Sequence, residues 1–225
     1  MALTASDIME RSSAIYNDTG YDRVSDSTAD NPNWFQFLDD ALKQVILLRP
    51  DSYCTTTTMQ LTSGTKQSLP TAGIRLMDII RNMGVDGSTV GTPIFYVDRN
   101  VLDMSLSTWH SATEENAVDN YWFDTDNPTV FYVTPPNTGN GYIELVYSIN
   151  HAALTATTDS IGLKDIFLNP ILSWSLYRAF LIDTDSEANW NRANHFYGDT
   201  YKSLGIEEKV MQEKSPSNQR KGRGM

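Results

Sequence analysis

The stretch FLNPILSWSLYRAFLIDTD, Phe167 to Asp185, is the most apolar and aromatic long segment of this 225-residue chain. Its apolar side chains, with those just before it, recur at helical spacing and predict a helix over Leu163 to Leu181. They form two rows: Leu163, Phe167, Ile171, Trp174 and Leu181 in one, and Leu168, Leu172, Leu176 and Phe180 in the other. A helix that is apolar on two faces is buried by more than one neighbour, so we expect it to pack within the domain and against another subunit.

Two other roles for this stretch, as a membrane anchor and as a catalytic pocket, are not expected. Asn169, Pro170, Arg178 and Asp183 interrupt it before the roughly 20 apolar residues that a membrane-spanning helix needs. It also lacks an acid, a base and a nucleophile that converge, so a catalytic pocket is not expected there. We expect helical-core or subunit-interface roles for Trp174, Tyr177, Arg178, Phe180 and Phe196.

Two helices are expected before this stretch. Residues 5–16 show a short amphipathic pattern, with Ile8, Ser12, Ile15 and Tyr16 on one side. Residues 17–31 form a polar, acidic loop. A longer helix is predicted over residues 33–48, with Asn31-Pro32 as its N-cap and first helical position, and with Arg49-Pro50 as its end.

One helix is expected directly after the stretch. Asp185-Ser186-Glu187 offers a capping side chain and an acid for its first turn, and Gly205 suits its C′ position. Its apolar stripe comprises Ala193, Phe196, Thr200 and Leu204. The short connection predicts an antiparallel helical hairpin. Residues 206–214 read as a further short helical stretch.

The middle of the chain is β-rich. Residues 54–61 and 66–70 flank Thr62-Ser63-Gly64-Thr65 and predict a hairpin. Residues 74–83 fit either a strand or a helix, and the strand is favoured because Ile74, Leu76, Asp78 and Ile80 alternate with Arg75, Met77, Ile79 and Arg81. Further strands are expected over residues 92–97, 121–123, 129–134 and 142–148, with a helical turn over 98–106.

The last two of these strands are joined by PPNTGNG, residues 135–141. We expect Pro135 and Pro136 to end the first strand and the glycines to form the corners of a hairpin. Along the final strand, Ile143, Leu145 and Tyr147 face one way and Tyr142, Glu144 and Val146 the other.

These patterns predict an α+β fold, in which an antiparallel helical bundle carries an inserted antiparallel β-rich layer and a flexible C-terminal tail. We expect the helical bundle over residues 1–50 and 160–214, the β-rich insertion over 51–159, and the flexible basic tail over 215–225. A chain of 225 residues can bury one sizeable core, or a main domain with an inserted layer.

Charge is distributed unevenly along the chain. The tail SPSNQRKGRGM holds Arg220, Lys221 and Arg223 and no acid, so residues 1–214 carry 14 basic and 28 acidic side chains. A body with a net charge of −14 repels phosphate, which makes tight binding of duplex DNA a poor hypothesis. If DNA is involved, we expect it to slide past the protein.

The single cysteine, Cys54, excludes an internal disulfide and a multi-cysteine zinc site. Its threonine-rich neighbourhood predicts a strand, in which a lone cysteine usually serves as a small hydrophobic side chain. The N-terminal residues lack a basic region followed by an apolar run, so no signal peptide is expected, and the expected compartment is a reducing cytoplasm.

Catalytic motifs are absent from the sequence. His110, His151 and His195 stand outside any zinc-binding spacing, and the chain has no phosphate-binding glycine loop and no G-x-S-x-G motif. Asp98, Asp103, Asp124 and Asp126 could gather around Mg²⁺ as in a nuclease, although turns and a helix cap account for them more simply. We therefore expect no enzyme, no cofactor and no metal.

Aromatic residues crowd the predicted strands and leave one further alternative open. A carbohydrate-binding or tail-tip module could stack sugars on them, although strand aromatics usually pack in a core. The residues concerned are Tyr121, Trp122, Phe123, Phe131, Tyr132, Tyr142 and Tyr147.

The order of several segments resembles head-to-tail adaptor (connector) proteins of short-tailed bacteriophages. After the Trp34-centred helix come LLRPD, QLTSGTKQSLP, RNMG, RNVLD leading to Trp109, FYVTPP and SWSLYRAFLIDTD. The resemblance spans roughly Trp34 to Gly205. The acidic loop over residues 17–31 and the C-terminal tail depart from it.

The resemblance implies a structural virion protein without catalytic activity, made in the host cytoplasm. Such adaptors form a twelvefold ring beneath the portal protein, extend the DNA channel, and offer an attachment surface for the tail nozzle and tail fibres. Their helical parts pack side by side, and a C-terminal extension reaches the portal. The basic residues Arg220, Lys221 and Arg223 are accordingly the portal-binding candidates.

Overall fold

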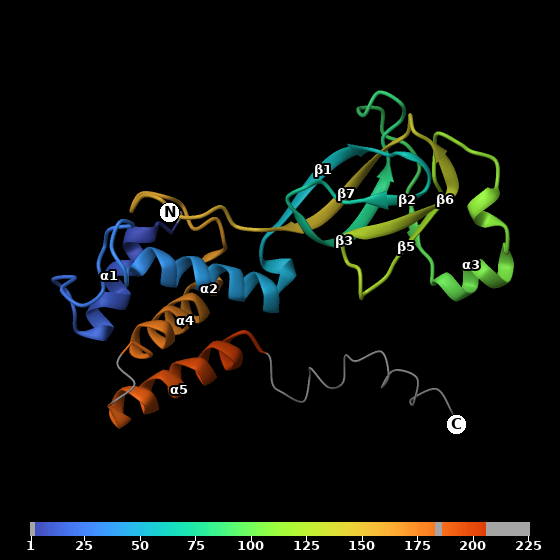
Figure 1. Cartoon of the computed structure of the whole chain (residues 1–225). Helices are drawn as coiled ribbons and strands as arrows, with labels where there is room; N and C mark the ends of the chain where they lie inside the picture. Colours follow the sequence, from blue (N-terminus) through green and yellow to red (C-terminus); the bar gives the residue numbers. More distant parts are fainter. Residues whose placement is uncertain (1–2, 183–185, 206–225) are drawn as a thin grey trace, which may run out of the picture. The chain divides into compact units, whose positions relative to one another are not determined.

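The structure, a computed structural model, describes residues 3–182 and 186–205 and has an α+β fold (Figure 1). The chain divides into two compact units. The helical unit comprises residues 1–52 and 151–225, and the β unit comprises Tyr53–Asn150. The expected helical stretch 206–214 and the expected flexible tail 215–225 lie outside the described residues, as does Asp185 of the expected cap.

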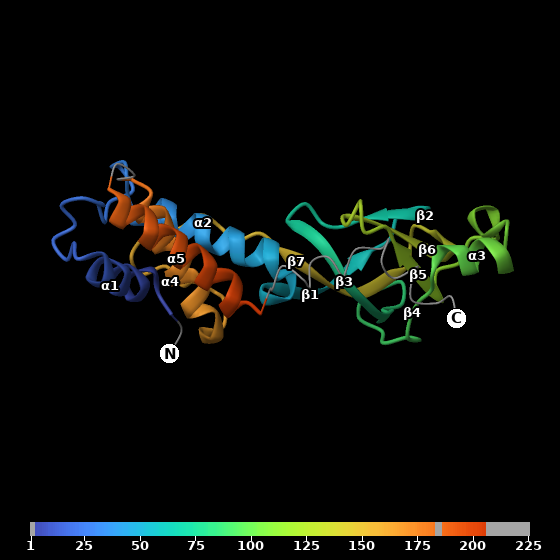
Figure 2. The same cartoon turned by 90° about the horizontal axis from the view of Figure 1, so that it is seen from below.

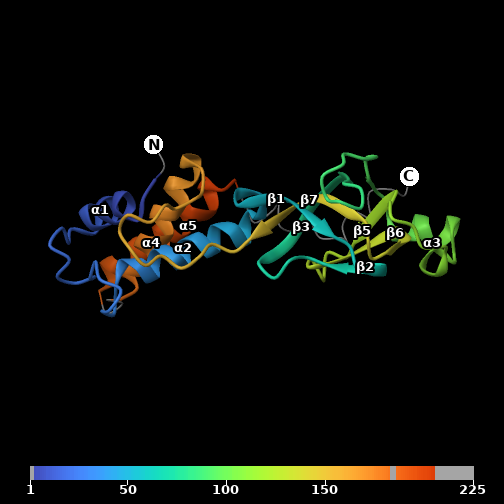
Figure 3. The ribbon, with the colours of Figure 1, turned by 90° about the horizontal axis from the view of Figure 1, so that it is seen from above.

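The helical unit contains four α-helices and two short 3₁₀ turns within its described residues. They are α1 (Ala5–Tyr16), α2 (Trp34–Leu48), η1 (Pro50–Ser52), η3 (Asp165–Phe167), α4 (Leu168–Phe180) and α5 (Glu187–Ser203). Figure 1 shows α4 between α2 and α5, and Figure 2 shows α5 covering α4. The segment over residues 151–163 runs along α2 (Figure 3), where the Leu154 amide donates to Asp39 Oδ1 over 3.1 Å. No helix in the described part of the chain is both long and apolar enough to cross a membrane.

Local capping explains where the first two helices begin. A capping box starts α1, because the Thr4 side chain accepts from the Asp7 amide and the Asp7 carboxylate accepts from the Thr4 amide. The predicted cap of α2 is wrong by two residues. Asn33, not Asn31, is the N-cap, and its side chain accepts from the Gln36 amide over 2.9 Å. Pro32 therefore precedes the helix instead of occupying its first position.

The helix of the opening stretch begins later than the spacing predicts. Leu163 is buried but lies before the helix, and the turn η3 separates it from Leu168. Pro170 marks the first turn of α4, because proline lacks the amide hydrogen that a residue further inside the helix would have to donate. The predicted end of the next helix is confirmed, since Gly205 follows the C-cap Leu204 with a φ of +68°.

The acidic loop before α2 is organised by a buried carboxylate. Asp18 is only 5% exposed and accepts hydrogen bonds from the backbone amides of Asp22, Arg23 and Val24 at 2.9–3.1 Å. A carboxylate that receives several amide donors can remain buried without a cationic partner. The loop thus has a polar centre of its own.

The β unit contains two sheets, one of three strands ordered β1-β7-β3 and one of four ordered β2-β6-β5-β4. All strand pairs are antiparallel except the two-residue pair of β4 with β5. The strands are β1 (Cys54–Gln60), β2 (Ser63–Ser68), β3 (Gly73–Asn82), β4 (Phe95–Tyr96), β5 (Asn120–Phe123), β6 (Val130–Thr138) and β7 (Tyr142–Ile149). The helix α3 (Arg99–Ser105) and the turn η2 (Trp109–Ser111) lie between β4 and β5 in the sequence.

Both predicted hairpins are wrong. The first would pair β1 with β2, but β1 pairs with β7 while β2 pairs with β6. The second would pair β6 with β7, but these strands lie in different sheets. Strand β6 continues through Pro135 and Pro136 because the ladder to β2 breaks there: Gly64 pairs with Asn137, and Lys66 pairs with Tyr132. Prolines are tolerated where a bulge interrupts the hydrogen bonding.

The strand predicted over residues 74–83 is confirmed as β3, but its predicted alternation is wrong. The buried positions are Leu76, Ile79 and Asn82, which are three residues apart. The register to β7 shifts at three places along β3, and each extra residue moves the following side chains to the opposite face. The alternation predicted for β7 is confirmed, because Ile143, Leu145 and Tyr147 are all buried.

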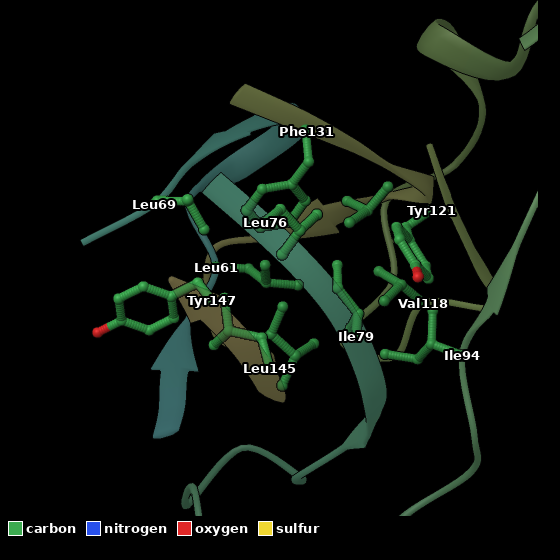
Figure 4. Packing of buried hydrophobic residues seen from close by; sticks show 12 residues of the cluster. Leu61, Leu69, Leu76, Ile79, Ile94, Val118, Tyr121, Phe131, Leu145 and Tyr147 are labelled. Carbon is green, nitrogen blue, oxygen red and sulfur yellow. The ribbon is translucent and has the colours of Figure 1, made fainter. Parts of the chain in front are cut away.

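The core of the β unit lies between its strands (Figure 4). Leu76 and Ile79 from β3 meet Phe131 from β6 and Leu145 from β7 there. Asn82 is the polar exception in this region, and its amide group is fully used. It donates to Val118 O at 2.8 Å and to the Thr92 carbonyl and hydroxyl oxygens, and it accepts from the Val118 amide at 2.9 Å.

Candidate functional site

Helix α4 is the centre of the helical unit, with contacts to α1, α2 and α5. Its fully covered side carries Ile171, Ser175 and Ala179, each 0% exposed. The Ser175 hydroxyl donates to the Ile171 carbonyl oxygen over 2.9 Å, so this small polar side chain is satisfied within the helix. Small residues on this side allow a neighbouring helix to approach closely.

Two of the five predicted helical-unit residues, Phe180 and Phe196, stack at the α4–α5 contact. Their ring centroids are 5.7 Å apart and their planes differ by 5°. Phe180 is only 5% exposed and also meets Tyr16 edge-on, with centroids 4.9 Å apart. The Arg192 guanidinium lies 5.7 Å from the Phe180 ring centroid. These contacts join α1, α4 and α5 around one aromatic ring.

Trp174 and Tyr177 lie in a half-exposed aromatic row on α4 and α5. The Tyr197 ring lies 6.0 Å from Trp174 and 5.3 Å from Tyr177 between centroids, and 4.9 Å from Tyr201. The Tyr197 hydroxyl donates to the Tyr201 oxygen over 3.3 Å. Burial, followed by this hydrogen bond, raises the pKa of Tyr201 to about 12. Tyr197 is 42% exposed, so the row presents apolar ring surface to solvent.

Arg178, the charged residue of α4, pairs with Asp40 of α2. Arg178 Nη2 lies 2.9 Å from Asp40 Oδ2, and the two side chains are 43% and 42% exposed. An ion pair this exposed contributes at most about 1 kcal/mol to stability. Arg178 therefore marks the rim of a surface more than it holds the core together.

This rim borders the α2/α4 cleft, a hollow of about 330 Å³. Its lining residues are Asp40, Lys43, Gln44, Leu47, Trp174 and Arg178. Leu47 stands at the edge of this cleft with 71% of its surface exposed. Gln36 and Lys43 are the other exposed residues of α2, so Leu47 is an apolar projection on the exposed side of this helix.

The α1/α4/α5 groove is a second, larger hollow of about 530 Å³. Its lining residues are Ile15, Asn169, Leu172, Ser173, Leu176, Phe196, Asp199, Lys202 and Ser203. Ile15 at its edge is 53% exposed, although the spacing in α1 places it on the apolar side with Ile8, Ser12 and Tyr16. That placement is wrong for Ile15 and right for the other three, which are buried.

The cleft and the groove open on opposite sides of α4. Trp174 and Arg178 line the cleft, while Leu172 and Leu176 line the groove. Each member of one pair follows a member of the other by two residues, and at 3.6 residues per turn this separates them by about 200° around the helix. The two apolar rows predicted on the opening stretch thus reach different surfaces. Trp174 of one row lines the cleft, and Leu172 and Leu176 of the other row line the groove.

Ile15 and Leu47 are the residues of these surfaces that sequence reasoning missed. Ile15 lies at the edge of the helical stripe of α1, and Leu47 lies in the last turn of α2 just before Arg49-Pro50. The position of Ile15 does not distinguish a buried side chain from an exposed one. The available signal was Leu47 itself, because it falls off the row formed by Leu38, Leu42 and Val45.

The aromatic residues of the β unit mostly cover one another. Trp122 is 7% exposed, and its ring stacks on Tyr132 with centroids 4.5 Å apart and planes 3° apart. The Arg99 guanidinium lies 5.5 Å from the Trp122 ring centroid. Tyr121, Phe131 and Tyr147 are buried in the core. Such rings are already packed and do not offer an open platform for sugars.

The four candidate acids have separate local roles. Asp98 caps α3 by accepting from the Asn100 amide, and Asp124 accepts from the Asp126 amide in a turn. Asp103 accepts from Trp109 Nε1 over 3.0 Å, and this hydrogen bond lowers the pKa of Asp103. Within residues 3–182 and 186–205, no three histidine, cysteine or acidic side chains gather in a way that could hold a metal ion.

The three histidines also lie apart. His110 stacks on Trp109 and its Nδ1 lies 2.9 Å from Thr65 Oγ1, whereas His151 is buried and His195 pairs with Asp199 across one turn of α5. The portal-binding candidates Arg220, Lys221 and Arg223 fall outside the described residues.

Comparison with known proteins identifies the family of this chain. A family model described as SU10 adaptor protein matches residues 3–221. A search of curated proteins found no match.

Proposed function

This chain belongs to the SU10 adaptor protein family, and on that premise we propose that it is a structural component of a bacteriophage virion that assembles as a ring. The match over nearly the whole chain is the observation that carries the proposal. The ring joins head to tail, docks beneath the portal, continues the DNA channel, and is twelvefold. Its work is assembly, without catalysis.

The helical unit suits side-by-side packing in such a ring. Every subunit of a cyclic ring touches two neighbours through two different surfaces. The cleft and the groove are two such surfaces, on opposite sides of α4. The partly exposed aromatic row of Trp174, Tyr177 and Tyr197 adds the ring surface that is enriched in protein interfaces. We assign Trp174, Tyr177 and Arg178 to the subunit contacts and Phe180 to the helical core, whereas Phe196 stacks on Phe180 and also lines the groove of the subunit contact.

The charge of the chain suits a DNA channel. Residues 1–214 carry a net charge of −14, so a ring of such subunits repels the phosphates of DNA passing through it. Repulsion keeps DNA from sticking while it moves. A protein that instead retained DNA would need basic residues to neutralise phosphates.

The two ends of the assembly use different parts of the chain. The tail residues Arg220, Lys221 and Arg223 bind the portal through their positive charge. The β unit offers the attachment surface for the tail nozzle and fibres. Exposed apolar side chains on β4 and α3 supply it: Phe95, Tyr96, Val101 and Met104 are 53–89% exposed.

Sedimentation of the purified protein with portal rings tests the portal contact. We expect the full chain to co-sediment with portal rings, and we expect the triple change Arg220→Ala, Lys221→Ala and Arg223→Ala to reduce the bound fraction at least tenfold. The matched control changes Lys66, Arg75 and Lys164 to alanine, which removes the same charge at exposed positions that line neither hollow. A wild-type protein that never joins portal rings contradicts the proposal.

A further inference from the structure

The α1/α4/α5 groove is a hollow, whereas the Leu47 edge, formed by Lys43 and Leu47 of α2, projects from the surface. The two surfaces could therefore fit together in one contact. The groove is hollow, with an apolar floor of Leu172, Leu176 and Phe196 and with Ile15 exposed at its margin. The Leu47 edge projects, because Leu47 is 71% exposed. Neither surface has a partner within the described part of the helical unit that covers it.

We propose that the α1/α4/α5 groove of one copy receives the Leu47 edge of α2 from the neighbouring copy. This rests on the proposed ring and names the residues by which adjacent subunits recognise each other. The contact is heterologous, since the groove side of one copy meets the cleft side of the next.

The size of the groove fits an occupant of several side chains. Its volume of about 530 Å³ lies within the roughly 300–1,000 Å³ of hollows that hold sizeable ligands. Leu47 would enter together with part of the aromatic row, since Trp174 lines the same cleft as Leu47. Leu47 and Ile15 are the most exposed apolar side chains that line these hollows. Burying them against each other removes their apolar surface from water, which is favourable.

The charged residues at the two margins are compatible with this contact. Lys43 is exposed and lies one helical turn before Leu47, so both side chains project from the same face of α2. Asp199 and Lys202 both line the groove, and Asp199 also lies 3.2 Å from His195 of its own helix. Asp40 and Lys43 line the cleft beside Leu47, so each margin brings one carboxylate and one cation to the other. Such pairs fix register more than they add affinity.

The direction of the contact also fits a closed ring. The groove and the cleft that Leu47 lines are bordered by side chains of α4 that lie about 200° apart around the helix. Surfaces that face nearly opposite ways let each copy hold one neighbour on each side. A symmetric dimer would instead use one surface twice and leave the other uncovered.

Cysteine cross-linking in the assembled ring tests this contact. In a Cys54→Ser background, three proteins carry Ile15→Cys, Leu47→Cys, or both, and each is mixed with portal rings and treated with a flexible bismaleimide. Both replaced side chains are largely exposed, so folding should be preserved, and circular dichroism checks it. We expect a ladder of covalent multimers from the double variant and no cross-linked pairs from either single variant.

The matched control pairs Leu47→Cys with Ile166→Cys, because Ile166 is 78% exposed in the helical unit and lines neither hollow. This control should give no ladder. Dimers from a single variant would show a symmetric contact and overturn the inference. A cross-link from position 15 to the portal, or to a cysteine introduced within residues 206–225 of its own chain, would name another occupant and also overturn it. Rings seen by negative stain without a ladder would overturn the inference alone, whereas an absence of rings would overturn the proposed function as well.

Discussion

Phe180 is the side chain that joins three helices of the helical unit. It stacks on Phe196 of α5, meets Tyr16 of α1 edge-on, and is 5% exposed. We expect Phe180→Ala to lower the free energy of unfolding by about 3–5 kcal/mol, because it removes apolar burial and leaves a cavity between the rings. Urea denaturation followed by tryptophan fluorescence measures this change.

The matched control is Ile166→Ala in the same unit. Ile166 is 78% exposed, so its truncation should change the free energy of unfolding by less than about 0.5 kcal/mol. Equal effects of the two changes would show that the aromatic stack does not hold the helices together.

Substitution by alanine should have opposite effects on stability at two glycines, Gly141 and Gly198. A Cβ at Gly141 would collide with the Asn116 carbonyl oxygen and the Asn137 side chain, whereas a Cβ at Gly198 in α5 meets nothing within 4 Å. Gly141→Ala should therefore destabilise the protein by at least about 2 kcal/mol. Gly198→Ala should stabilise it by about 0.5–1 kcal/mol, because alanine loses less entropy in a helix. Thermal unfolding of both variants decides this, and a destabilising Gly198→Ala would contradict the open surface on α5.

Asp159 predicts an acid-dependent loss of stability. Its carboxylate accepts from the backbone amides of Thr155 and Ala156 at 2.8 and 2.9 Å, and these hydrogen bonds lower the pKa of Asp159. A lowered folded-state pKa means that the contribution is present above the unfolded value, about 3.9, and is lost as the pH falls through the folded value. The difference in unfolding free energy between wild type and Asp159→Asn should be present at pH 7 and shrink below about pH 4. A constant difference in urea titrations across this range would contradict that origin.

At the scale of elements, helices could be predicted from the sequence better than sheet pairing. The predicted helix 5–16 is confirmed residue for residue as α1, and the predicted helix 33–48 differs from α2 by one residue. Helix signals are local: apolar spacing, a capping side chain and a proline stop all lie within a few residues of the element. Gly205 is another local signal, because it follows the C-cap of α5 as predicted.

Strand pairing failed because its causes are distant in the sequence. The partners of β1 and β2 are β7 and β6, about 60 to 95 residues away, so a glycine turn between two strands could not reveal that they belong to different sheets. The bulges of β3 move Leu76 and Ile79 to the same face, against strict alternation. Pro135 and Pro136 lie inside β6 and do not end it, because the hydrogen-bond ladder to β2 is interrupted there. The sequence alone does not show where such an interruption occurs.

The candidate surfaces were predictable only in part. The composition of the opening stretch identified α4 as a helix with more than one neighbour, and α1, α2 and α5 all contact it. The exposure of Leu47 agrees with its place off the buried row of α2, whereas the exposure of Ile15 depends on how the helices cover each other. That arrangement follows from packing across the whole helical unit and not from the spacing within any one helix.

At the scale of the whole molecule, the β unit should fold by itself. Its two ends are adjacent, because Cys54 pairs with Ser148 and the Ile149 amide donates to the Tyr53 carbonyl oxygen over 3.2 Å. Residues 53–150 also enclose a core of their own. We expect this fragment to unfold cooperatively on heating and to give dispersed amide signals in NMR spectra. A fragment without a thermal transition would show that the helical unit is needed for its folding.

Electron microscopy of the purified protein mixed with portal rings tests the central claim most directly. We expect a ring of twelve copies on one end of the portal, with helical units side by side and a continuous axial channel. Portal rings that remain bare, or that carry copies without contact between neighbours, would contradict the account.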